Sequence, residues 1–122
     1  MNEDDITEKI IGCAYSVARE LGFGFLEKVY ENAMIIELSE KKLQVENQKS
    51  INVFYHGKNV GQYYADLIVE NRVIVELKSI KELNSVHKAQ LLNYLKATKH
   101  RIGLLINFAP EKVEIKRVIN GY

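Results

Sequence analysis

Residues 65–78 read ADLIVENRVIVELK, two apolar runs separated by the polar residues 70–72. Runs rich in β-branched residues on either side of a short polar break predict a β-hairpin. The second run, residues 73–78, begins with three apolar residues in a row, which favours a strand buried on both faces. Each predicted strand also carries one carboxylate, Asp66 in the first and Glu76 in the second.

Asp66, Glu76 and Lys78 are predicted to share one patch of this hairpin. Glu76 and Lys78 are two residues apart, so their side chains leave the same face of the strand, and the tight turn brings Asp66 close to Glu76. Buried carboxylates are costly unless they are paired or bound to a metal ion, and their hard oxygens suit Mg²⁺ or Mn²⁺. The spacing alone also fits a plain ion pair of Lys78 with a carboxylate on a solvated sheet face.

The sequence on either side of the hairpin predicts further helices and strands. Apolar residues at three- and four-residue steps predict helices over residues 5–21 and 26–42, and Gly22 suits the end of the first. Asp4, Asp5 or Thr7 is expected to cap the first helix. Alternating and β-branched residues predict strands at 45–48, 51–55 and 60–69, with a turn at 56–59.

After the hairpin, Asn84 or Ser85 is expected to cap a third helix that ends near Lys99. Strands are predicted at residues 102–106 and, as an edge strand, at about 113–118. The order is helix, helix, three strands, helix, strand, strand, which indicates an α/β fold with helices on the faces of a sheet. Because the chain shows no repeat, linker or low-complexity tract, we expect residues 1–122 to form a single domain.

Composition excludes several classes of protein. No stretch approaches the roughly 18–20 apolar residues that cross a bilayer, and the acidic, amphipathic start is unlike a secretory signal. The single cysteine, Cys13, excludes a disulfide framework and a CxxC metal site, and we expect it to fill the core or its boundary. A cytoplasmic protein without a membrane partner is the simplest interpretation.

Charge is unevenly distributed although the net charge is only +1. Residues 1–48 carry a net charge of −5 and residues 49–122 a net charge of +6. The basic second part could face phosphate groups while the acidic first part faces water. Ordinary scatter of charges between helices and strands explains the same numbers, so the distribution alone leaves both interpretations open.

Two further polar patterns fall on the predicted helices. Gln90 and Tyr94 are four residues apart, so they share one face of the third helix and could point at the carboxylate patch. Gly24, Glu27 and Tyr30 form Gly-x-x-Glu-x-x-Tyr at the start of the second helix. Each pattern also has an ordinary explanation, because acidic residues favour helix N-termini and polar residues cover exposed helix faces.

Together these motifs resemble one family. Residues 24–33, GFLEKVYENA, look like the signature of the GxxExxY proteins, which are placed in the PD-(D/E)XK nuclease superfamily. The resemblance covers about residues 5–119, and it continues through Asp66 and through VIVELK (73–78), HKAQLLNYL (87–95) and GLLINF (103–108). Gln-x-x-x-Tyr after Glu-x-Lys also resembles the RecB-like branch. The resemblance implies a restriction-endonuclease-like αβββαβ core, with a mixed central sheet flanked by helices.

The resemblance further implies a metal-dependent nuclease that hydrolyses phosphodiester bonds, with DNA as the expected nucleic acid. It would place Mg²⁺ (or Mn²⁺) on the carboxylates of Asp66 and Glu76 and on the Leu77 backbone carbonyl. Lys78 would lie near the attacking water and Glu27 at the rim of the site. Gln90 and Tyr94 would hold phosphate or steady the water. Ala65 stands where the family motif has a proline, a departure that is common in this superfamily.

The basic residues near the third helix would follow the nucleic-acid backbone through salt-sensitive contacts. They are Lys88, Lys96, Lys99 and Arg101. The alternative is a catalytically silent nuclease-fold module that binds nucleic acid or a protein partner. The intact Asp66, Glu76 and Lys78 favour the enzyme. Because the predicted core leaves no separate substrate-reading domain, specificity would come from a homodimer or from a partner protein.

Overall fold

The computed structural model of the protein describes residues 1–121. Its helices are α1 (Glu3–Leu21), α2 (Glu27–Glu40) and α3 (Ser85–Thr98), and its strands are β1 (Val45–Tyr55), β2 (Lys58–Val69), β3 (Val73–Lys78), β4 (Ile102–Phe108) and β5 (Val113–Ile119). The observed bounds of β3 are those predicted from the sequence. In the described residues, no helix is both long enough and apolar enough to cross a membrane.

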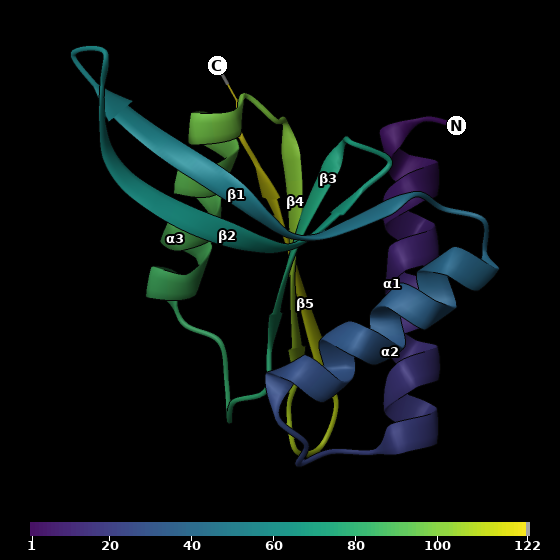
Figure 1. The fold of residues 1–122 in the computed structure, drawn as a ribbon. Coiled ribbons are helices and arrows are strands. Elements are labelled where there is room, and N and C mark those ends of the chain that lie inside the picture. The colour runs from purple at the N-terminus through teal and green to yellow at the C-terminus, as the bar shows by residue number, and fades with distance from the viewer. Residues whose placement is uncertain (122) are drawn as a thin grey trace.

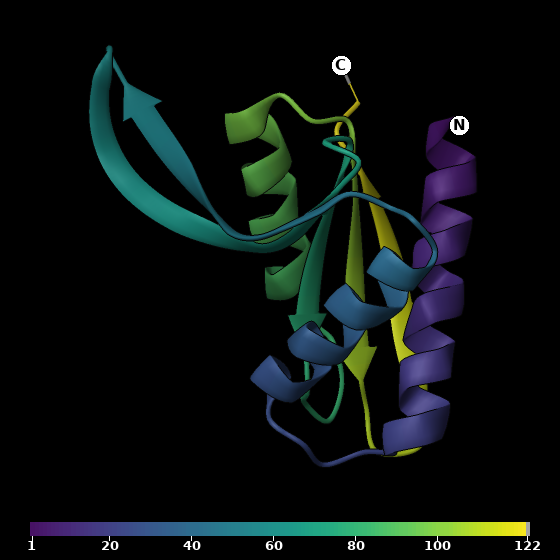
Figure 2. The same cartoon turned by 45° about the vertical axis from the view of Figure 1, so that its right-hand side comes forward.

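The strands form one sheet in the order β1-β2-β3-β4-β5. Strands β3 and β4 run parallel and the other neighbours are antiparallel, so the sheet is mixed. Helix α3 makes the crossover between the two parallel strands, as such a connection requires. Helices α1 and α2 cover one face of the sheet and α3 covers the other (Figure 1, Figure 2). This arrangement confirms the predicted restriction-endonuclease-like α/β fold.

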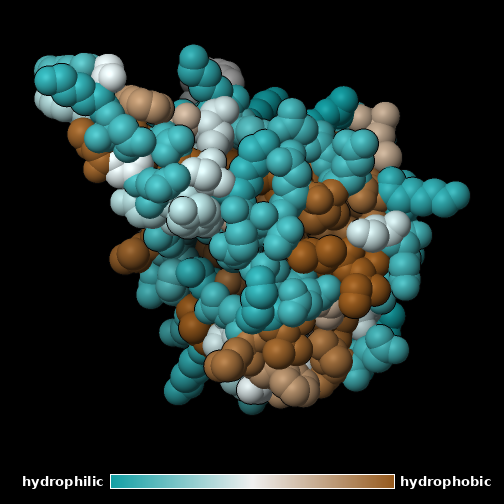
Figure 3. Space-filling view, viewed as in Figure 1, coloured by the Kyte–Doolittle hydropathy of each residue, from teal (hydrophilic) through white to brown (hydrophobic). Residues whose placement is uncertain are grey.

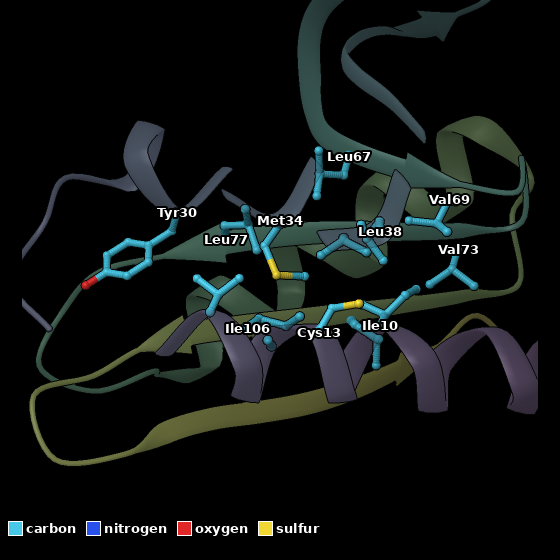
Figure 4. Packing of buried hydrophobic residues seen from close by; sticks show 14 of the residues in the cluster. Ile10, Cys13, Tyr30, Met34, Leu38, Leu67, Val69, Val73, Leu77 and Ile106 are labelled. Atoms are coloured by element: carbon cyan, nitrogen blue, oxygen red, sulfur yellow. The ribbon is translucent and has the colours of Figure 1, made fainter. Parts of the chain in front are cut away.

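The larger core lies between the sheet and the pair α1 and α2 (Figure 4). Helix α1 contributes Ile10 and Cys13, and α2 contributes Met34 and Leu38, all fully buried. They pack on apolar residues of the three central strands, among them Leu67, Val69, Val73, Leu77 and Ile106. Cys13 is a free cysteine within this core, as expected.

The second core lies between the sheet and α3, where Leu91 and Leu95 are buried. Gly103 in β4 allows this helix to come close. A Cβ atom added at Gly103 would lie 3.0 Å from Cδ1 of Leu91, closer than an unstrained contact. The small residue therefore fixes the distance between α3 and the sheet, and with it the position of the polar residues that α3 carries.

The first turn of α1 begins earlier than predicted. Its cap is Asn2, whose side-chain oxygen accepts a hydrogen bond from the Asp5 N–H at 2.8 Å, while the Asp5 carboxylate accepts one from the Asn2 N–H. The prediction of Asp4, Asp5 or Thr7 as the cap was wrong because this reciprocal capping box satisfies two free N–H groups at once. Gly22 ends the helix with φ +75°, and Asn84 caps α3, both as predicted.

Residues 45–55 form one strand, where the sequence predicted two strands separated by Lys49 and Ser50. These polar residues continue the ladder opposite Ala65 and Tyr64. They are tolerated there because β1 is an edge strand and one of its faces is open to water. Beyond its short pairing with β3, β2 pairs only with β1, and the two strands project as a curved hairpin (Figure 1, Figure 2). Residues 49–65 are called the hairpin arm below.

We predict that Gly103→Val lowers the free energy of unfolding by about 1–3 kcal/mol, because the added methyl groups meet Leu91. Leu91→Ala alone is expected to cost about 2–5 kcal/mol through the cavity it leaves. The double variant should be destabilised by clearly less than the sum of the two, since each change makes room for the other. Urea unfolding of the four proteins measures this coupling, and simple additivity would contradict it.

Candidate active site

The β2–β3 ladder ends where two carboxylates take its place. The strands pair from Val69 opposite Val73 to Leu67 opposite Val75. At the next position, the Asp66 N–H donates to Oε2 of Glu76 at 2.8 Å, and the Leu77 N–H donates to Oδ2 of Asp66 at 2.8 Å. Each carboxylate thus replaces a backbone partner of the other strand. Asp66 and Glu76 therefore lie at the point where β2 and β3 separate.

Burial and proximity raise the pKa of both acids. Glu76 is 8% exposed. Its burial, and then the neighbouring charge of Asp66, raise its pKa from 4.5 to about 8, although the Asp66 N–H and the Lys78 charge act in the opposite direction. Burial also raises the pKa of Asp66, which the Leu77 N–H partly offsets. In the absence of a cation, the two groups therefore resist being ionised together at neutral pH.

Lys78 and Tyr94 lie around this carboxylate pair. Lys78 is the last residue of β3, it is partly exposed, and its charge acts on both acids. Tyr94, on the sheet-facing side of α3, is 7% exposed. Its ring centroid lies 5.4 Å from that of Tyr63 on β2. Burial, followed by the charge of Glu76, raises the pKa of Tyr94 to about 12, so its hydroxyl stays protonated and can donate a hydrogen bond.

The acid that α2 brings to the site is Glu31. Glu31 is 4% exposed, and its Oε1 accepts a hydrogen bond at 2.8 Å from Nε2 of Gln48, which also lies 3.3 Å from Oδ1 of Asp66. Lys28 pairs with the other oxygen of Glu31 at 2.9 Å. Glu27, which the sequence singled out, is exposed at the first position of α2. Glu31 lies one helical turn after Glu27, and this i, i+4 spacing is the only signal in the sequence that could have identified Glu31.

Tyr30 supports the site without taking part in it. Its hydroxyl donates to the carbonyl of Gly22 at 2.7 Å, and its ring stacks on Phe108 with centroids 4.2 Å apart. The same hydroxyl accepts a hydrogen bond from the Phe25 N–H at 3.4 Å. The Tyr of Gly-x-x-Glu-x-x-Tyr therefore ties the loop between α1 and α2 to the core. That tie fixes how α2, and with it Glu31, is placed on the sheet.

The other predicted residues occupy two different regions. Gln90 and Lys96 lie on α3 beside a groove that also contains Tyr94, and Lys88 is exposed on the first turns of that helix. Lys99 and Arg101 precede β4, at the end where Val73 pairs with Ile102, whereas Lys78 pairs with Asn107 at the other end. Arg101 lies 3.7 Å from Glu3 of α1. Four residues of strand, or about 13 Å, separate Arg101 from Leu105, the residue that pairs with Glu76.

The family model of the PD-(D/E)XK nuclease superfamily matches residues 4–118. The chain belongs to the PD-(D/E)XK nuclease superfamily. In this superfamily, nucleic acid is the expected ligand and divalent metal ions are generally required. No curated protein matches the chain.

A solved structure shares the fold of this superfamily member. The crystal structure of SSO0001 matches with a TM-score of 0.61 and 20% sequence identity. The match covers 98% of this chain and 60% of the SSO0001 chain, so the present chain corresponds to only part of that protein. At this identity, the likeness concerns the fold alone.

The donor set of this superfamily member fits a cation that keeps much of its water. Within residues 1–121, no group of three or more His, Cys, Asp or Glu residues is arranged to hold a metal ion. The site instead offers two adjacent carboxylates, with Glu31 linked to Asp66 through Gln48. Mg²⁺ is commonly bound by one or two carboxylates plus water, whereas structural zinc needs four protein ligands. The residues present therefore fit Mg²⁺ or Mn²⁺.

We predict that the metal-free protein loses stability as the pH rises from about 4.5 to about 8. Over this range the unfolded chain releases the Glu76 proton while the folded protein retains it, so stability is greatest at the low end and falls with rising pH. Glu76→Gln, which cannot ionise, should flatten this dependence. Urea midpoints measured in EDTA across the range test the prediction.

The matched control for this measurement is Glu46→Gln, which removes an exposed glutamate that pairs with Lys49 at the surface. It should leave the slope of stability against pH as in the wild type. A wild-type profile that is flat, or a slope that Glu76→Gln keeps, would contradict the assignment of the raised pKa to Glu76.

Proposed function

We propose that this protein is a nuclease that hydrolyses phosphodiester bonds with Mg²⁺ or Mn²⁺ bound at Asp66 and Glu76. The observation that carries the proposal is the reciprocal hydrogen bonding of these two buried acids, with Lys78 two residues further along β3. Adjacent carboxylates with raised pKa values are typical of a site that binds a divalent cation. The chain also belongs to a nuclease superfamily.

The metal ligands would be the carboxylate oxygens of Asp66 and Glu76 that accept no backbone hydrogen bond, together with the backbone carbonyl of Leu77. Gln48 and Glu31 act as positioning residues, because they hold one oxygen of Asp66 through a hydrogen-bonded chain. A divalent ion at these ligands supplies Lewis acidity, which lowers the pKa of bound water and neutralises phosphate charge. The buried negative charge of Glu31 adds to the attraction for that ion.

The remaining site residues act on the substrate and on the attacking water. The Lys78 ammonium would orient that water or stabilise the negative charge that develops on phosphorus-bound oxygens. The protonated Tyr94 hydroxyl and the Gln90 amide would donate to a phosphate oxygen. Glu27, exposed at the start of α2, would contribute only at the rim of the site, through water.

Several finer assignments are part of the same proposal. They are membership of the GxxExxY branch, DNA as the substrate, a single domain over residues 1–122, and a homodimer or partner protein that adds specificity. Lys88 and Lys96 would contact the nucleic-acid backbone near the site. Lys99 and Arg101 could reach only a more distant part of the same strand. The cytoplasmic location expected from the sequence stays a prediction.

We predict that about 10 mM Mn²⁺ raises the melting temperature of the wild type by several degrees. An ion that binds with a dissociation constant of about 1 mM stabilises the folded state by roughly 1.4 kcal/mol at that concentration. Glu76→Ala should remove the shift. Lys78→Ala should keep the shift yet slow metal-dependent cleavage about 100-fold or more, because it removes a charge used in the transition state.

Lys116→Ala is the matched control for Lys78→Ala, since Lys116 is exposed on β5. It should leave both the shift and the cleavage rate unchanged. The proposal would be overturned by a shift that persists in Glu76→Ala, or by full cleavage in Lys78→Ala. Nucleic-acid binding without any metal-dependent cleavage would indicate a silent nuclease-fold module instead.

The two glutamates of α2 are expected to differ in their effect on cleavage. Glu31→Gln should reduce cleavage about tenfold or more and weaken Mn²⁺ binding, because it removes a buried charge linked to Asp66. Glu27→Gln, one helical turn earlier and exposed, should have a much smaller effect. Cleavage rates measured over a range of Mn²⁺ concentrations give both quantities. A larger loss in Glu27→Gln would reverse the assignment.

A further inference from the structure

A groove runs between the hairpin arm and α3. It has a volume of about 550 Å³. One wall comes from the arm and the other from α3, and the residues that line it are Asn52, Val53, Phe54, Tyr63, Gln90, Asn93, Tyr94, Lys96 and Ala97. Tyr94 belongs both to this groove and to the surroundings of Asp66 and Glu76, whose charges act on its hydroxyl. Tyr94 therefore connects the groove with the proposed active site.

The groove lining carries one positive charge, that of Lys96, and no negative charge. Residues 49–65 of the arm contain two lysines and no acidic residue, and residues 83–110, which include α3, contain three lysines and Arg101 and again no acidic residue. These two segments hold six of the twelve lysines and arginines of residues 49–122 and none of the six acidic residues of that part of the chain. Such a surface is complementary to a polyanion.

Aromatic rings and amides lie along the same walls. Phe54 is 63% exposed and Tyr63 is 46% exposed, so their rings are open to a ligand. On the opposite wall, the side chains of Gln90 and Asn93 are exposed, and among residues 1–121 they have no hydrogen-bond partner. Exposed rings stack on bases, and amides can bond to the Watson–Crick edges of bases, which are free only in an unpaired strand.

A double helix fits this groove poorly. Its base faces are covered by their neighbours, so Phe54 and Tyr63 could stack only after bases were unstacked, at a cost in free energy. A second protein copy has a more apolar surface available elsewhere, although the arm itself exposes Tyr55, Val60 and Tyr64. In Figure 3 the larger brown area lies below the arm, towards α2 and the loop between α1 and α2. Phe23, Phe25 and Leu26 of that loop are exposed.

We propose that the groove between the hairpin arm and α3 binds a single, unpaired nucleic-acid strand and guides it to the carboxylate pair. Bases stack on Phe54 and Tyr63, while Lys96 contacts phosphate. This inference rests on the proposed nuclease function and narrows its substrate to single-stranded nucleic acid, or to a duplex end that has opened.

The test measures binding separately from cleavage. Fluorescence anisotropy follows labelled oligo-dT, oligo-U and a dT·dA duplex, each of about 16 nucleotides or base pairs, in EDTA and again in Ca²⁺. The wild type should bind the single strands about tenfold or more tighter than the duplex. Phe54→Ala should weaken strand binding roughly fivefold or more, and Phe54→Trp, which keeps a ring, should restore it.

Two further variants locate the strand. Lys96→Ala should reduce the slope of log affinity against log salt by about 0.7, the value for one phosphate of a single strand. Tyr64→Ala is the matched control, since Tyr64 follows Tyr63 in β2, is 53% exposed and does not line the groove. It should bind like the wild type. Circular dichroism melts check that every variant is folded.

Each result has a defined meaning. The groove proposal is overturned if the duplex binds more tightly, if strand binding is unchanged in Phe54→Ala, or if Tyr64→Ala causes the larger loss of binding. None of these results affects the proposed metal-dependent cleavage, which is measured in a separate assay. Strand binding that depends on Phe54, without cleavage, supports the groove and overturns the nuclease. Binding of neither form overturns the groove proposal. A preference for oligo-dT or for oligo-U supports the groove and identifies the sugar it accepts.

Discussion

Strands β2 and β3 stop pairing at the position where Asp66 faces Glu76, and much of the molecule depends on this break. The two carboxylates accept the hydrogen bonds that a continued ladder would have made, so the strands can separate without leaving these N–H groups unpaired. On one side of the break the sheet continues into the core through β3 and β4. On the other side β2 leaves with β1 as the hairpin arm. The same two residues thus form the candidate site and lie where the hairpin arm separates from the rest of the sheet.

The fold follows from the sequence because its central elements carry strong local signals. A run that begins with three apolar residues and follows a polar turn defines β3. Helical periodicity defines α1, whose buried face includes Ile10, Ala14 and Val17. Because the central strands are buried on both faces, few other folds could bury all of these apolar residues. The juxtaposition of Asp66 and Glu76 follows from the same hairpin and needs no further tertiary information.

The positions of the other candidate site residues depend on tertiary packing, which the spacing of residues in the sequence does not predict. Glu27 and Glu31 lie one turn apart on nearly the same helix face. Which of them reaches the sheet depends on how Tyr30, Met34 and Leu38 seat α2 in the core. Gln48 reaches Asp66 from a backbone position with φ +51°, which its residue type does not predict. The length of the arm likewise depends on where β2 parts from β3, and the distance of Arg101 from the site depends on the parallel pairing of β4.

The irregular backbone of β1 has a consequence for how the chain behaves in concentrated solution. β1 is an edge strand along its whole length, and a long, flat edge invites another chain to add a strand and start aggregation. This edge is not flat: Gln48 adopts a left-handed conformation, the register shifts between Val53 and Phe54, and Lys49 places a charge in the strand. These features twist and charge the edge, and so protect it from unwanted β-sheet extension while its aromatic residues stay exposed.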